Sequence, residues 1–109
     1  MTLDEWQAEI AKWSLLNFGD QPSDYPLLGV AEELGELCHH HLKGKQGIRI
    51  NEEHKLCKMD AVGDIIIYLA DYCSREGFSL RECLKKATTV VLSRDWKANR
   101  VDGVGDDKE

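Results

Sequence analysis

Two acidic hexapeptides of similar pattern stand out in the sequence. Residues 32–37 and 60–65 each run from an acid through an apolar residue and a glycine to a second acid. The outer acids are four residues apart, so in a helix they lie on one face and repel by about 0.2–0.5 kcal/mol. A glycine inside a helix costs about 0.5–1 kcal/mol relative to alanine. Because the chain carries both penalties twice, the pattern favours a use for clustered carboxylates.

Carboxylate oxygens are the ligands of hard divalent cations. The predicted donors are Glu32, Glu33, Glu36, Asp60 and Asp64. Such donors favour Mg²⁺, with Mn²⁺ as an alternative, over zinc. Mg²⁺ usually shares its coordination with substrate phosphates, which predicts phosphate-ester or phosphoanhydride chemistry. Gly35 and Gly63 are expected to let two helix backbones approach closely, so that the two acidic faces meet.

A solvated acidic face is the competing interpretation, because the acids of residues 32–36 lie on the helix face opposite the apolar stripe that contains Leu34. Asp60 and Asp64 argue against it, since they form a narrow polar line on a segment that is otherwise apolar. Unpaired charge is costly to remove from water, so each needs a partner. That partner is either a metal ion or a cation of the last predicted helix, such as Arg94.

Apolar periodicity predicts an all-α fold, a bundle of four helices joined by short loops. Capping patterns open the first helix at Thr2 and the fourth at Ser79, and Asn51 is the expected N-cap of the third. The helices are expected at residues 2–17, 26–43, 51–76 and 79–97. Within the third helix, the stretch from Ala61 to Cys73 is apolar over most of the helix circumference, which indicates a central helix. One domain, residues 1–98, is followed by a tail, residues 99–109.

Composition narrows the functional classes. With 109 residues and a net charge of −6, the chain is an acidic single domain, so we expect no binding to nucleic acid and none to a membrane. No segment looks like a signal peptide, which favours a cytoplasmic location. The cysteines lack metal-ligand spacing and are expected to be reduced core residues. They are Cys38, Cys57, Cys73 and Cys83.

A run of three histidines, residues 39–41, follows the first hexapeptide. Glu36 and His39 match half of the ligand pattern of di-iron bundles, but the second half is missing from residues 51–76. Arg94, Lys97 and Arg100 follow the last apolar stripe. They either complement the helix dipole or hold phosphate oxygens.

Taken together, these residues resemble the MazG-like family of all-α nucleoside triphosphate pyrophosphohydrolases. The family pattern is E-E-x-x-E on one helix and E-x-x-D on the next. Residues 32–36 match the first half, and Asp64 matches the last position of the second. The flanking segments are also similar, including Trp13, residues 17–19, residues 46–49 and residues 94–96. Ala61 replaces the first Glu of E-x-x-D, and Asp60 is the candidate substitute for the missing oxygen.

The resemblance implies Mg²⁺-dependent hydrolysis of a (d)NTP to (d)NMP and pyrophosphate. Glu33, Glu36 and Asp64 then hold the metal, joined by Asp60, and Glu32 activates water or binds a second ion. Predicted substrate contacts are Trp13 and Asn17 for the nucleoside and Arg49, Arg94 and Lys97 for the phosphates. The family builds its site between subunits, which implies a homodimer or homotetramer. A non-catalytic helical interaction module and a di-iron bundle are the alternatives.

Overall fold

The computed structural model describes residues 1–105, which contain four helices and no strand. The all-α prediction is therefore confirmed for this part of the chain. The helices are α1 (Leu3–Phe18), α2 (Asp24–Gln46), α3 (His54–Glu76) and α4 (Leu80–Leu92). None of them is long and apolar enough to span a membrane.

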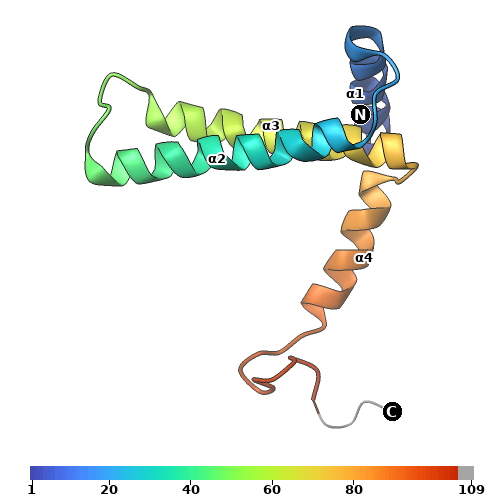
Figure 1. Cartoon of the computed structure of the whole chain (residues 1–109). Coiled ribbons are helices and arrows are strands. Elements are labelled where there is room, and N and C mark those ends of the chain that lie inside the picture. Colours follow the sequence, from blue (N-terminus) through green and yellow to red (C-terminus); the bar gives the residue numbers. More distant parts are fainter. Residues whose placement is uncertain (106–109) are drawn as a thin grey trace.

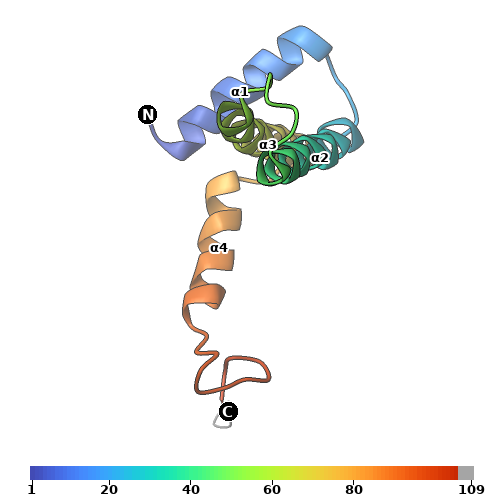
Figure 2. The same cartoon turned by 90° about the vertical axis from the view of Figure 1, so that its left-hand side faces the viewer.

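The long helices α2 and α3 run side by side as an antiparallel hairpin, and α1 lies across α3 (Figures 1 and 2). The fourth helix leaves the end of α3 and projects away from the hairpin (Figure 1). It contacts α1 and α3 but not α2. The radius of gyration is 18.1 Å, whereas a compact domain of this length has about 13 Å. Within one chain, α4 therefore stands apart from a three-helix unit.

Both ends of the second helix and the start of the third differ from the prediction. The second helix starts two residues before Pro26 and runs on to Gln46, where Gly47 adopts a left-handed cap at φ 69°. The third begins at His54 rather than Asn51, because residues 47–53 form turns that include Arg49 at φ 55°.

The fourth helix ends at Leu92, so its predicted extension to Lys97 is wrong. Asp95 favours a turn over a continued helix there, because its Oδ1 accepts hydrogen bonds from the backbone N–H groups of Lys97 and Ala98. Its own N–H donates to the Gly103 carbonyl, which folds residues 95–103 back on themselves. Gly103 has φ 77°, and a Cβ there would lie 2.8 Å from the Cβ of Arg94. Of the predicted tail, residues 106–109 lie outside the described residues.

The apolar core of one chain is small. Ala70, Cys73 and Leu80 form its buried cluster, and Leu3, Trp6 and Ile10 pack against it. These three side chains recur at helical spacing and form the face of α1 that meets the core. All four thiols are free, but Cys38 and Cys83 are exposed, so the prediction that they are core residues is wrong. Burial raises the pKa of the Cys73 thiol, and the nearby Cys83 adds to the effect.

A buried polar network joins α1 to α3. Arg75 Nε donates to Asp71 Oδ1 at 2.9 Å, and Ser14 Oγ donates to Asp71 Oδ2 at 2.8 Å. The same guanidinium donates to Ser14 Oγ and to the Gln21 carbonyl, both at 2.8 Å. It therefore fixes the loop that leads from α1 into α2.

A second network closes the junction of α3 and α4. The Gln7 amide nitrogen donates to Ser74 Oγ at 3.0 Å and to the Phe78 carbonyl at 2.9 Å. Its oxygen accepts the Leu80 N–H at 2.7 Å. Ser79 caps α4 by accepting the Glu82 N–H, as predicted. These contacts satisfy backbone groups that helix termini leave without partners.

Replacing Arg75 by Met should lower the free energy of unfolding by about 3 kcal/mol, because Asp71 would keep a charge in a site where its side chain is only 13% exposed. Arg81→Met is the matched control, since its pair with Asp4 is about half exposed and should matter far less. Urea unfolding of the three proteins measures both effects. Equal losses in the two variants would contradict a special role for Arg75.

Candidate functional site

The two hexapeptides face one another across the α2–α3 hairpin and line one groove of about 370 Å³. The groove is lined by Glu32, Glu33, Glu36, His40, Cys57, Asp60, Ala61 and Asp64. All the predicted metal donors thus line one groove, but among residues 1–105 no three of their carboxylates bring donor atoms within 4.8 Å of one another. Asp60 lines the groove beside Ala61, where the resemblance expects the missing glutamate.

The carboxylates of this groove have no strong cationic partner. Among residues 1–105, none of them forms an ion pair with Lys or Arg. Glu36 has the nearest basic contact, an ion pair in which its Oε2 lies 3.9 Å from His40 Nε2. The alternative that Arg94 pairs with Asp64 is therefore not seen within one chain.

Electrostatic repulsion is evident at Glu33, which is half-buried. Burial raises the pKa of its carboxyl, and the charges of Asp64, Glu32 and Glu36 raise it further. The pKa of the Tyr68 phenol is also raised, first by burial and then by the charges of Glu32, Glu33, Asp64 and Asp71. The groove is thus a region of negative potential.

An aromatic pocket of about 540 Å³ adjoins the acidic groove. Its lining residues are Ile10, Trp13, Phe18, Gln21, Tyr25, Pro26, Glu33, Asp64, Ile67, Tyr68 and Asp71. Trp13 and Phe18 meet edge to face, with ring centroids 5.6 Å apart. Glu33 and Asp64 line both hollows, so the aromatic pocket and the carboxylates form one continuous site.

Other predicted substrate contacts lie elsewhere. Asn17 is exposed and donates its amide to the Trp13 carbonyl at 2.8 Å, outside the pocket lining. Arg49 lies in the α2–α3 turn. Arg94 stacks over Trp96 at 5.8 Å from the ring centroid, and Lys97 follows it beyond α4. Because α4 points away from the hairpin (Figure 1), these two cations do not reach the groove of their own chain.

The expected role of the two mid-helix glycines is wrong within one chain. A Cβ built at Gly35 or Gly63 would meet nothing within 4 Å. The close contact between α2 and α3 occurs instead at Gly29, where a Cβ would lie 2.5 Å from the Tyr68 ring. Gly29 therefore lets Tyr68 lie flat against α2 and form a wall of the aromatic pocket.

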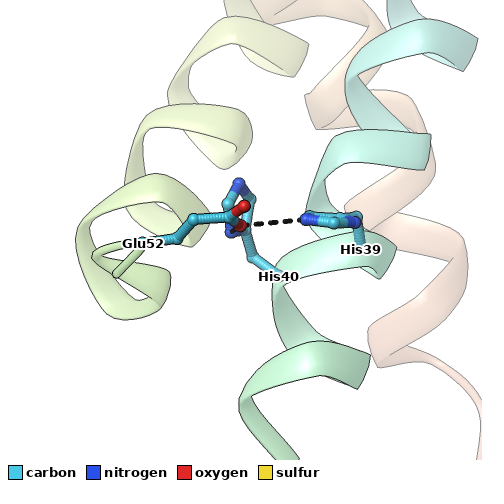
Figure 3. A group of neighbouring side chains, drawn as sticks. All are labelled: His39, His40 and Glu52. Carbon is cyan, nitrogen blue, oxygen red and sulfur yellow. Dashed lines mark hydrogen bonds and ion pairs between the residues drawn. The ribbon is translucent and has the colours of Figure 1, made fainter. Parts of the chain in front are cut away.

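A second group of donor side chains lies at the turn between α2 and α3 (Figure 3). His39 and His40 come from α2, and Glu52 comes from the turn that precedes α3. The hydrogen bond from His39 holds the pKa of Glu52 below its ordinary value, and charge interactions add to this. The histidine run is the one part of this group that the sequence signals, because Glu52 and His54 are brought to it only by the reversal of the chain between α2 and α3.

No family model, curated protein or solved structure matches this chain. The resemblance to the MazG-like family therefore stays a prediction that rests on the quoted motif residues.

Glu33 gives the metal-free protein a defined pH dependence. Its pKa is higher in the folded chain than the ordinary 4.5, so the folded state binds its proton more tightly. Its contribution to stability is complete below pH 4.5 and is lost as the pH rises through the folded pKa. In the presence of chelator, Glu33→Gln should remove this loss, which thermal melts between pH 4 and pH 7 would measure. Identical pH profiles of the two proteins would contradict the raised pKa.

Proposed function

We propose that the chain is an Mg²⁺-dependent nucleoside triphosphate pyrophosphohydrolase that works as a homo-oligomer. The observation that carries this proposal is the sharing of Glu33 and Asp64 by the acidic groove and the aromatic pocket. A nucleotide has the same two parts, an aromatic base and a polyanion that needs a cation. Its base fits the aromatic pocket while its phosphates lie over the carboxylates.

The donor set fits Mg²⁺, or Mn²⁺ in its place. It consists of oxygen atoms from two facing helices, it repels itself, and no Lys or Arg neutralises it in the described chain. Glu33, Glu36 and Asp64 would hold the cation, with Asp60 beside Ala61. When bound, the cation would neutralise the phosphates and the charge that develops on leaving pyrophosphate.

Side chains of the same chain would bind the base and activate the water. Trp13 and Tyr68 offer ring faces and edges to the base, and Phe18 supports Trp13. Glu32 lies in the groove with no hydrogen bond to a protein group among the described residues, so it is free to accept a proton from water. An attack by this water on phosphorus gives (d)NMP and pyrophosphate.

This activity predicts pyrophosphate, and not orthophosphate, from at least one common NTP or dNTP in the presence of Mg²⁺. Asp64→Asn and Glu36→Gln should abolish the turnover because each removes a metal donor. Glu9→Gln, an exposed acid on α1, is the matched control and should keep it. Absence of turnover across the whole nucleotide panel with both Mg²⁺ and Mn²⁺ would refute the proposal.

Equilibrium binding of Mg²⁺ separates the enzyme from its alternatives. The proposed enzyme binds Mg²⁺ and loses affinity in the Asp60→Asn variant if Asp60 substitutes for the missing glutamate. A non-catalytic helical interaction module leaves Mg²⁺ unbound, and a di-iron bundle acquires colour after iron loading.

The exposed apolar surface supports the oligomer. On α3 the side chains of Leu56, Met59 and Val62 are each more than half exposed. On α4 only Leu80 is buried, although Leu84, Ala87 and Val91 continue its stripe. Large exposed apolar patches mark interaction surfaces. A second copy would cover them.

An oligomer would also bring the C-terminal cations, Arg94 and Lys97, close to carboxylates. We infer that α4 packs its apolar stripe on a second copy and brings Arg94 and Lys97 to the acidic groove of that copy. Gly35 and Gly63, which meet no side chain within their own chain, would then allow the close approach of the partner. The predicted homodimer or homotetramer thus completes a site that one chain leaves open.

Sedimentation velocity at micromolar concentration should show a dimer or tetramer. Leu84→Asp should reduce the mass of the particle, because it places a charge in the apolar stripe of α4. Lys85→Asp changes the charge at the adjacent exposed position and should leave the assembly intact. A wild-type monomer, or equal effects of both substitutions, would argue against this interface.

A further inference from the structure

The histidine cluster at the α2–α3 turn has the geometry of a metal centre. His39 Nε2 lies 3.0 Å from Glu52 Oε1, and His40 Nδ1 lies 3.6 Å from the same oxygen (Figure 3). The three donor atoms lie within 4.8 Å of one another. In a tetrahedral zinc site with bonds of about 2.0–2.1 Å, neighbouring donors are about 3.3 Å apart. Both measured distances are close to this value.

A third imidazole borders the cluster. His54 Nδ1 lies 2.9 Å from His40 Nδ1 and 4.0 Å from Glu52 Oε1. The other ring nitrogen of His54 lies 3.0 Å from the Ile48 carbonyl, which can only accept a hydrogen bond. Nε2 of His54 therefore carries the hydrogen, and Nδ1 presents a lone pair to the cluster. Metal-binding histidines are oriented by this same kind of contact with a backbone carbonyl.

The ring of His40 also has a polar group on the side away from Glu52. His40 is buried, at 8% exposure, and its Nε2 faces the Glu36 carboxylate at 3.9 Å. At 3.9 Å this contact is an ion pair and not a hydrogen bond. His40 Nδ1 and His54 Nδ1 form a hydrogen bond of 2.9 Å, and because the hydrogen of His54 lies on Nε2, the shared hydrogen belongs to His40 Nδ1. Metal binding would move this hydrogen to Nε2, on the side of Glu36, and make the Nδ1 lone pair available to the ion.

Among residues 1–105, Glu52 forms no ion pair with Lys or Arg, although the charge of Arg49 contributes to its lowered pKa. Its side chain is 29% exposed and that of His39 is 34% exposed, so an ion can enter from solvent. Imidazole nitrogens with one carboxylate suit zinc and its neighbours in the first transition row, whereas Mg²⁺ prefers oxygen. This donor set differs in kind from the carboxylates of the acidic groove.

We propose that His39, His40 and Glu52, with His54 as the adjoining fourth donor, bind one Zn²⁺-class dication. The ion links the end of α2 to the start of α3 and so fastens the turn of the hairpin. The site shares His40 with the lining of the acidic groove, but its donor set does not depend on the proposed activity.

The test uses the full-length chain, free of any affinity tag and stripped of metal. Titration with Co²⁺ should give the visible absorption of a four-coordinate site at one ion per chain, and Zn²⁺ should displace the Co²⁺. Competition with a chromophoric chelator should give a zinc dissociation constant of about 1 μM or lower. A zinc constant weaker than about 100 μM would overturn the proposal.

Four variants locate the ion. His40→Gln and Glu52→Gln should each weaken zinc binding at least about tenfold. His41→Gln is the matched control, because His41 belongs to the same run but is exposed and outside the cluster. It should bind as the wild type does, and so should Asp64→Asn, which alters only the acidic groove. If His41→Gln or Asp64→Asn weakens binding as much as His40→Gln, the assignment is wrong.

Thermal melts provide a second measurement in case His40→Gln folds poorly. Zn²⁺ should raise the Tm of the wild type and of His41→Gln, because it binds the folded chain. It should not raise the Tm of Glu52→Gln, whose substitution lies in a turn at the protein surface. A wild-type Tm that does not change with Zn²⁺ would contradict the proposal that the bound ion stabilises the α2–α3 hairpin.

Discussion

The buried ion pair of Arg75 and Asp71 is the contact on which the geometry of the aromatic pocket and the proposed nucleotide site depends. The free-energy cost of removing two charges from water is offset only when their remaining hydrogen-bonding groups have partners. Here Ser14 and the Gln21 carbonyl provide those partners. The loop between α1 and α2 is thereby fixed to α3. This loop joins Phe18 at the end of α1 to Tyr25 at the start of α2, and its Gln21 lines the aromatic pocket together with Asp71. The ion pair therefore holds the ends of both helices, and with them two aromatic residues of the pocket, beside the carboxylates.

A second constraint comes from how little apolar surface one chain buries. The core has few buried side chains, whereas α3 is apolar around most of its circumference. One side of α3 is covered by α2 and another by α1, and the stripe that includes Met59 and Val62 stays exposed. Water exclusion at that stripe requires a further partner. Self-association is the simplest way for a chain with two unpartnered helix faces to obtain it.

The sequence predicted the helices well because their periodicity and caps are local properties. The meeting of the hexapeptides was also predictable, since two long helices joined by a short turn must be antiparallel. The roles of Gly29 and Arg75 were not, because each depends on a contact with a residue far along the chain. The end of α4 was missed for another reason. Asp95 offers its carboxylate to nearby N–H groups, and this competes with the helix more strongly than the apolar pattern suggests.

The hairpin therefore carries two donor sets of different chemistry along one seam. Oxygen donors gather near its middle, where two helix faces meet, and nitrogen donors gather at its turn, where the chain reverses. His40 belongs to both, because one ring nitrogen faces Glu36 and the other faces Glu52 and His54. An ion at the turn would take the Nδ1 lone pair of His40, move the ring hydrogen to Nε2 on the side of Glu36, and so reduce the negative potential of the groove. Occupancy of the turn would then weaken cation binding at the carboxylates, because the two sites share one imidazole.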